Sequence, residues 1–150
     1  MDYLKCIDIS NWQAGIDIGA ALKKVDMAIF KASEGTGFTD SQCAGWVKAA
    51  RKAGKPFGVY HFFRGRGVAE ADHFLSVCKA WVGKGVLILD VETEECSKAE
   101  VQAFVKRVHA KCGVWPWVYT SASFVVQFMN EYVKKRCALW CAGYPTQPTT

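Results

Sequence analysis

The sequence predicts an α/β domain in which a mainly parallel sheet curls into a TIM-like (β/α) barrel. Apolar segments with strand character alternate with amphipathic helical segments, as in right-handed βαβ units. Polar side chains stand where the predicted strands end, namely Asp8, Lys31, Glu34, His61, Asp90, Glu92 and Tyr119. We favour the barrel because it brings many strand ends to one mouth, whereas a doubly wound open sheet joins only the central few.

The composition is that of one globular domain covering residues 1–150. Its hydrophobic fraction is 51%, and no segment has the apolar length of a membrane span. The formal charge of +5 comes from scattered basic residues, which do not predict a nucleic-acid-binding surface. The start of the chain lacks the features of a secretory signal. We therefore expect synthesis in the cytoplasm without a signal peptide, no membrane insertion and no nucleic-acid partner.

The cysteines do not predict disulfide bonds or a metal site. There are seven, which is an odd number, and none forms a CxxC pair. Cys137 and Cys141 are spaced like metal ligands, as are His109 and Cys112, but no second ligand pair accompanies them. We interpret the cysteines as reduced thiols that pack as small hydrophobic residues.

The first half of the chain predicts three strands separated by helices. The strands are expected at residues 5–9, 27–32 and 57–63, and a glycine-rich loop is expected after the second strand. A short helix is expected over residues 17–24. A longer one is expected over residues 41–53, with Thr39 and Asp40 capping its start and Gly54 stopping it.

The second half continues the alternation and brings the total to about six strands. A helix with apolar residues at 3–4 spacing is expected over residues 71–82, followed by a strand over 86–92. Ser97 and Glu100 form a capping-box pattern that starts a helix ended by Gly113. Two further strands, at residues 115–120 and 138–142, flank a helix over 124–133.

The fourth predicted strand carries two acids that its apolar sequence does not explain. Asp90 and Glu92 are two residues apart, so their side chains point to the same face as Ile88. Buried carboxylates are costly unless charges, hydrogen bonds or a reaction require them. A helix N-terminus would explain the acids after Glu92 but not Asp90, which is still inside the strand. We therefore interpret the pair as part of a functional site.

Other polar residues near the strand ends allow more than one interpretation. Lys31 is expected to face inward, where an ion pair with a buried acid is favoured over a direct role. Glu34 is either a site acid or a solvated loop charge, and His61 is either a hydrogen-bonded core residue or a substrate contact. Ser10 and Ser33 show no evident pairing with a histidine and an acid, so a serine hydrolase is not expected.

Six motifs occur in an order that resembles glycoside hydrolase family 25, the Chalaropsis-type lysozymes that include many bacteriophage endolysins. The resemblance covers essentially the whole chain. The motifs are Asp8-Ile9-Ser10-Asn11-Trp12-Gln13, Lys31-Ala32-Ser33-Glu34-Gly35, Gly58-Val59-Tyr60-His61-Phe62, Leu89-Asp90-Val91-Glu92, Tyr119-Thr120-Ser121 and Leu139-Trp140-Cys141-Ala142-Gly143-Tyr144.

The resemblance implies a TIM-like irregular (β/α) barrel. It also implies hydrolysis of the β-1,4 bond between N-acetylmuramic acid and N-acetylglucosamine in peptidoglycan, without a metal or other cofactor. It implies a catalytic site of Asp8, Asp90 and Glu92. Glu92 would be the acid/base, and Asp90 an ionised partner that acts as nucleophile or stabilises the substrate's acetamido oxygen. The expected substrate-binding residues are Glu34, Tyr60, His61, Tyr119, Trp140 and Tyr144. Such a protein acts on the bacterial cell wall after release and is encoded by a phage or prophage.

The chain departs from the family pattern after its sixth predicted strand, because two further strands and a late aspartate are missing. We therefore expect a C-terminally incomplete barrel, or one completed by another copy or a second chain. An alternative function is a non-catalytic wall-binding or assembly module. A chitinase-like barrel is not favoured, because Ile88 stands where its D-x-x-D-x-D-x-E pattern requires an acid.

Overall fold

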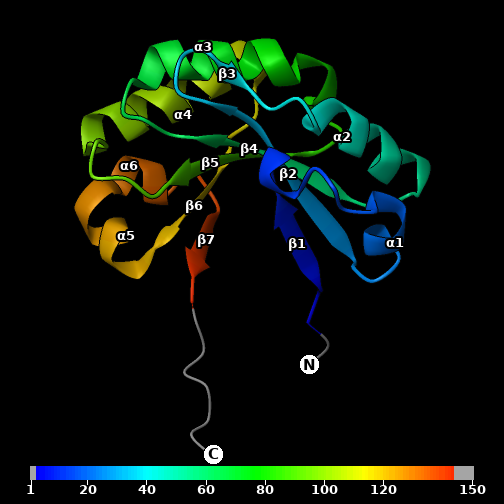
Figure 1. Cartoon of the computed structure of the whole chain (residues 1–150). Helices are drawn as coiled ribbons and strands as arrows, with labels where there is room; N and C mark the ends of the chain where they lie inside the picture. The colour runs from blue at the N-terminus through cyan, green and yellow to red at the C-terminus, as the bar shows by residue number, and fades with distance from the viewer. Residues whose placement is uncertain (1–2, 144–150) are drawn as a thin grey trace, which may run out of the picture.

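The computed structural model describes residues 3–143, which form one curled sheet with helices on its outer side (Figure 1). The strands are β1 (Cys6–Ile9), β2 (Met27–Glu34), β3 (Phe38–Thr39), β4 (Phe57–Phe62), β5 (Val86–Val91), β6 (Trp117–Ser121) and β7 (Leu139–Ala142). The helices are α1 (Ile18–Leu22), α2 (Cys43–Lys52), α3 (Gly67–Cys78), α4 (Lys98–Cys112), α5 (Ala122–Phe128) and α6 (Glu131–Lys134), with short 3-10 turns η1 (Asn11–Gln13) and η2 (Lys79–Trp81).

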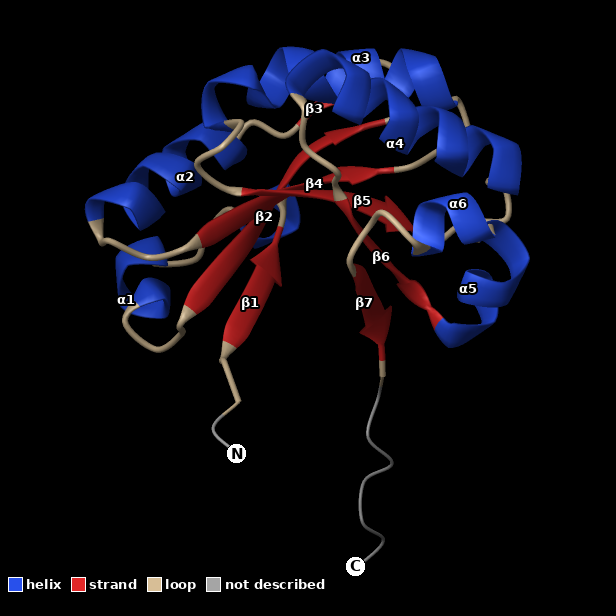
Figure 2. Ribbon diagram, turned by 180° about the vertical axis from the view of Figure 1, so that it is seen from behind, coloured by secondary structure: helices blue, strands red, loops and turns tan. Residues whose placement is uncertain are grey.

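The sheet forms a half-barrel. Its longer strands pair in parallel in the order β1-β2-β4-β5-β6-β7, and the short β3 pairs antiparallel with β2. Figures 1 and 2 show that the helices cover the convex face and that β1 and β7 stand at the two ends of the arch. Within residues 3–143 these end strands do not pair with each other. The predicted α/β fold with about six parallel strands is therefore confirmed, and the described residues form an incomplete barrel.

Strand pairing decides which side chains meet on the concave face. Phe62, Asp90, Tyr119 and Trp140 are paired in register across β4, β5, β6 and β7. Side chains alternate between the two faces of a strand, so the residues on either side of this row point toward the helices. One row of paired residues therefore supplies an acid and three aromatic rings to the concave side.

The hydrophobic core lies between the convex face of the sheet and the helices. Phe63, Phe74 and Phe104 are buried there, with ring centroids 5.6 Å apart between Phe63 and Phe104 and 6.0 Å apart between Phe74 and Phe104. Helices α3 and α4 approach so closely that a Cβ at Gly67 would overlap the carbonyl oxygen of Glu100. The Gly67 N–H also donates a hydrogen bond to Glu100 Oε2.

Two strand ends differ from prediction by two residues each. β2 continues to Glu34, beyond its predicted end at Ala32, because the short β3 pairs with its last residues. β6 begins at Trp117, later than predicted, while Trp115 stacks on His109 with ring centroids 3.9 Å apart. Tertiary contacts that a strand pattern does not contain set both boundaries.

The start of α2 also differs from prediction. The helix begins at Cys43, and Thr39 and Asp40 do not cap it. The Asp40 carboxylate accepts hydrogen bonds from the backbone N–H groups of Gln42 and Asn11, at 2.9 and 2.8 Å. Asp40 therefore ties the start of α2 to the turn that follows β1.

Two predictions about the later helices were partly wrong. Ser97 Oγ accepts from the Glu100 N–H as predicted, but the Glu100 carboxylate binds Gly67 instead of completing a capping box. The helix expected over residues 124–133 is divided into α5 and α6, because Asn130 starts α6 by accepting a hydrogen bond from the Val133 N–H. No helix within residues 3–143 is long and apolar enough to cross a bilayer.

Removing the central ring of this core should destabilise the protein strongly. Phe104→Ala is expected to lower the free energy of unfolding by about 3–5 kcal/mol, because it leaves a cavity among aromatic neighbours. Denaturant titration followed by circular dichroism measures the change. Val126→Ala is the control, since Val126 is 76% exposed and its loss should cost less than about 0.5 kcal/mol. Equal effects of the two variants would contradict this description of the core.

Candidate active site

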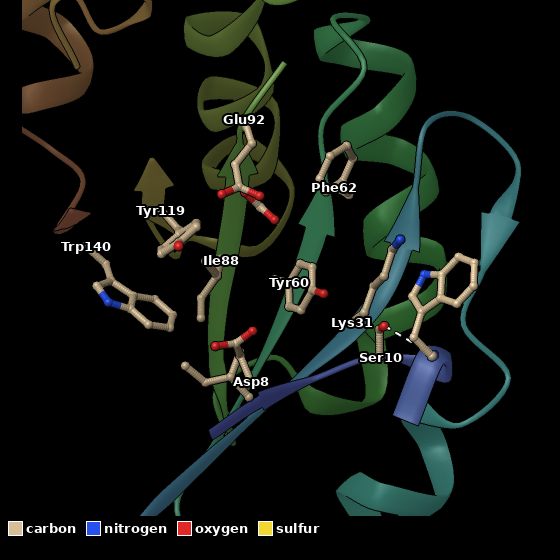
Figure 3. A pocket seen from close by; sticks show the side chains of 12 residues that line it. Asp8, Ser10, Lys31, Tyr60, Phe62, Ile88, Glu92, Tyr119 and Trp140 are labelled. Carbon is tan, nitrogen blue, oxygen red and sulfur yellow. Dashed lines mark hydrogen bonds between the residues drawn. The ribbon is translucent and has the colours of Figure 1, made fainter. Parts of the chain in front are cut away.

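A pocket of about 370 Å³ opens on the concave face of the half-barrel. Figure 3 shows side chains from both ends and the middle of the sheet directed into this space. The pocket is lined by Asp8, Ser10, Trp12, Ile29, Lys31, Tyr60, Phe62, Ile88, Asp90, Glu92, Tyr119 and Trp140. Every one of the six parallel strands, or the turn that follows it, therefore contributes to one site.

The acid pair occupies the carboxyl end of β5. Alternation along the strand sends Ile88 and Asp90 to the pocket and Leu89 to the helix side, where Leu89 is fully buried. Asp90 is only 6% exposed, and its Oδ1 has no hydrogen-bond partner among the described residues. Glu92 follows the strand and is exposed. The two carboxyl groups are within hydrogen-bonding reach of each other but sit in different surroundings.

Burial changes the acidity of both groups. Loss of water contact, followed by the charges of Glu92 and Asp8, raises the pKa of Asp90 to about 8, and Lys31 only partly opposes this rise. Burial and the charge of Asp8 also raise the pKa of Glu92, although a hydrogen bond with Asp90 works against the rise. The hydrogen bond between the two carboxyl groups requires that they share one proton. In the free site burial favours the protonated form of Asp90, whereas the sequence predicted an ionised Asp90.

The opposite side of the pocket comes from β1 and the turn after it. Asp8 pairs in register with Ile29 of β2, and both side chains line the pocket. Ser10 caps the following turn: its Oγ accepts from the Trp12 N–H, and Gln13 Oε1 accepts from the Ser10 N–H. Trp12 is 85% exposed at the rim. A capped turn thus fixes the edge of the site next to Asp8.

A chain of charges runs from the pocket to the rim. Lys31 is buried and lines the pocket, and its Nζ is 2.5 Å from Glu34 Oε2. The predicted ion pair is therefore present, although its acid is half-buried and not fully buried as expected. Arg64 donates two hydrogen bonds to Glu34 Oε1, at 2.7 and 2.9 Å. Burial works against the charged form of Glu34, but hydrogen bonds from Lys31 and Arg64 outweigh it and lower its pKa. Glu34 itself does not line the pocket; it holds Lys31 there.

Aromatic side chains form the remaining wall. Tyr119 and Trp140 meet edge to face, with ring centroids 4.7 Å apart. Burial, followed by the charges of Asp90 and Asp8, raises the pKa of Tyr60, so its hydroxyl stays protonated. These rings give the pocket apolar faces beside polar tips, a combination that suits sugar rings.

Two predicted substrate-binding residues, Glu34 and His61, do not line the pocket. His61 is 0% exposed and lies on the helix side of β4, with its ring against Phe74 and Phe104 at centroid distances of 5.6 and 5.3 Å. The alternation of side chains along a strand could have shown this, because the adjacent residues Tyr60 and His61 cannot face the same side. The predicted substrate contact by His61 is therefore corrected to the hydrogen-bonded core role. Tyr144 lies outside the described residues.

Other lining residues were not among the predicted site residues. Ser10 could have been found, because it shares strand parity with Asp8. The sequence pattern predicts Ile29 and Ile88 to be ordinary core residues. They line the pocket because the sheet is curled. Within residues 3–143, no group of three or more histidine, cysteine, aspartate or glutamate side chains is arranged to hold a metal ion.

The buried acid predicts a specific pH dependence of stability. Folded Asp90 titrates near pH 8, whereas an unfolded aspartate titrates near its ordinary value of 3.8. Between these values the folded state binds the extra proton, so the stability contributed by protonated Asp90 is lost as the pH rises. The free energy of unfolding of Asp90→Asn, relative to that of the wild type, should therefore increase as the pH rises from about 4 to about 8. Urea titrations across this range measure the difference.

Asp72→Asn is the matched control, because Asp72 is a surface acid paired with Arg107 whose pKa is lowered. Its difference from the wild type should stay constant between about pH 5 and pH 8. A constant difference for Asp90→Asn as well would contradict the burial of a protonated acid.

The chain matches known proteins along nearly its whole length. Residues 7–150 match the sequence model of the family described as Glycosyl hydrolases family 25. An N,O-diacetylmuramidase from a Chalaropsis species is 32% identical over 138 residues, and an autolytic lysozyme from Clostridium acetobutylicum is 30% identical over 148. These matches cover 78% and 94% of this chain but only 65% and 45% of the two relatives. The chain thus spans about half to two thirds of their lengths.

Solved structures share the fold. The muramidase from Acremonium alcalophilum matches with a TM-score of 0.82 and 27% identity, covering 99% of this chain and 81% of that one. The bacterial lysozyme from Streptomyces coelicolor matches with a TM-score of 0.80 and 25% identity, covering 100% and 78%. The CTP1L endolysin matches with a TM-score of 0.79 and 25% identity, covering 99% and 55%. From its sequence and its half-barrel, this chain belongs to glycosyl hydrolase family 25.

Proposed function

We propose that this chain is a peptidoglycan hydrolase that cleaves the β-1,4 bond between N-acetylmuramic acid and N-acetylglucosamine. The observation that carries the proposal is the Asp90–Glu92 pair, two adjacent carboxyl groups with raised pKa values in an aromatic-walled pocket. Glycoside hydrolysis needs one carboxyl group that holds a proton and a second that carries charge. Family membership and relatives named as muramidases and lysozymes support the same reaction.

Glu92 is the proton donor in this proposal. It is the more exposed member of the pair, so it can reach the oxygen of the scissile bond. As that oxygen takes the proton, the bond to the sugar's anomeric carbon breaks and positive charge develops on the ring. Asp90, having given up the shared proton, faces this charge as nucleophile or as the group that holds the substrate's acetamido oxygen. Asp8 adds negative charge nearby, and Glu92 then serves as base for water.

The predicted binding residues divide into three groups in this proposal. Tyr60, Tyr119 and Trp140 line the pocket and would contact the sugar rings directly. Glu34 does not line the pocket, and its role in this proposal is to hold Lys31 in place through their ion pair. Tyr144 remains a prediction for the stretch beyond residue 143. The proposed substrate is bacterial cell-wall peptidoglycan, reached after release from a cell that carries a phage or prophage.

Completion of the barrel by a second copy or another chain also remains a proposal. The end strands β1 and β7 are unpaired with each other within the described residues, which leaves backbone hydrogen-bonding groups at two sheet edges. Sedimentation of the purified protein should give a mass above 16.6 kDa if copies associate.

Replacing Glu92 should abolish the reaction without unfolding the protein. Glu92→Gln keeps the shape of the side chain but cannot donate the proton, so the rate of wall hydrolysis should fall by about 10²–10⁴-fold. Clearing of a suspension of purified cell walls measures the rate, and mass analysis of the released fragments identifies the bond that is cut.

Glu94→Gln is the matched control, because Glu94 lies on the same loop, outside the pocket, and bonds Gln127. It should retain wild-type activity. If Glu92→Gln clears walls as fast as the wild type, the proposed role of Glu92 is wrong. A wild-type chain that binds walls without releasing fragments would support the non-catalytic alternative.

A further inference from the structure

Three buried polar side chains form a hydrogen-bonded row behind the pocket, from β2 to α3. Ser33 Oγ is 2.8 Å from His61 Nδ1, and His61 Nε2 is 2.6 Å from Glu70 Oε2. The sequence did not predict this pairing. The residue types are those of a serine hydrolase, but all three residues are 0% exposed, so no substrate can reach Ser33 Oγ. The row therefore has another role.

Ser33, at one end of this row, lies where the pairing of β2 with β4 is irregular. Lys31 pairs with Tyr60, whereas Ser33 pairs with His61, so Ala32 is an extra residue opposite β4. An extra residue breaks the alternation of side chains along a strand. Because of it, Ser33 faces the core beside His61 while Lys31 stays on the pocket side. The hydrogen bond between Ser33 and His61 fixes this bulge.

Glu70, at the other end of the row, binds the backbone of the loop after β4. The Glu70 carboxylate accepts hydrogen bonds from the backbone N–H groups of Arg64 and Arg66, each at 2.9 Å. The Arg64 side chain bonds Glu34, and Glu34 bonds Lys31. Both ends of the buried row thus lead to Lys31, one through the bulge and the other through Arg64 and Glu34.

The position of Lys31 matters because it is the one basic side chain among the described residues that line the pocket. It is also the group that opposes the rise in the pKa of Asp90. The titratable and charged side chains that line the pocket with Asp90 are Asp8, Lys31, Tyr60, Glu92 and Tyr119. A small shift of the Lys31 ammonium group would change the pKa values of the acids in the pocket, since the field of a charge is strong where water is excluded.

We propose that Ser33, His61 and Glu70 are positioning residues that hold the Lys31 ammonium group at a fixed place in the acidic pocket. Burial lowers the pKa of His61, so the neutral ring donates its Nε2–H to Glu70 and accepts the Ser33 hydroxyl at Nδ1. This orientation locks the ring between β2 and α3. The catalytic consequence rests on the proposed muramidase function, but the position of Lys31 can be tested without substrate.

The test follows the titration of the Asp90 and Glu92 carboxyl carbons by NMR in the full chain. Ser33→Ala removes the hydroxyl and releases the bulge, so the midpoints of the pair should rise. Lys31→Met should move them in the same direction, because it removes the cation outright. In wall-clearing assays Ser33→Ala should lower kcat by roughly tenfold or more, since catalytic groups tolerate little displacement.

Phe74→Leu is the control for a merely structural effect. It disturbs packing against the His61 ring but leaves the hydrogen bonds, so it should lower Tm without moving the carboxyl midpoints. The proposal is overturned if Ser33→Ala titrates like the wild type, or if Lys31→Met does. If Ser33→Ala does not fold, Glu70→Gln makes the same test from the other end of the row. Shifted midpoints in a chain that never cleaves walls would support the positioning role and refute the muramidase.

Discussion

The structure depends on keeping a carboxyl group inside a parallel strand. Asp90 is buried in its strand between Phe62 and Tyr119 of the neighbouring strands, and one of its oxygens has no hydrogen-bond partner among residues 3–143. Such a group is tolerated only if it is neutral or compensated. Glu92 shares its proton, and Lys31 supplies partial compensation. The ion pair with Glu34, the contact of Glu34 with Arg64 and the bulge in β2 all maintain that compensation.

Much of this fold follows from local sequence patterns. Apolar strands alternate with amphipathic helices, and this periodicity predicts a parallel sheet covered by helices. The acid pair was predictable because two carboxyl groups at the end of an apolar strand need a reason to be there. The contributions of Tyr60, Tyr119 and Trp140 to the pocket were expected from their places near strand ends, and the register of the strands brings them together.

Other features depend on contacts that no local pattern contains. The bulge at Ala32 inverts the alternation of β2, so periodicity alone sends Ser33 to the wrong face. Glu70 lies on a helix, and nothing in its spacing connects it to His61 on a strand. Glu100 has the spacing of a capping box, yet its carboxylate binds the backbone of another helix. Helix boundaries and buried hydrogen bonds were therefore the least predictable parts of the structure.

The contact between Gly67 and Glu100 has a dynamic consequence. It joins the first turn of α3 to the first turn of α4, with no space for a side chain between them. Since α3 carries Glu70 and α4 follows the loop after Glu92, we expect these two segments to open together as one unit. The amide proton of Gly67 should therefore exchange with solvent about as slowly as those of the central strands. We expect the larger local fluctuations at the two ends of the arch, where β1 and β7 each pair with one neighbouring strand within residues 3–143.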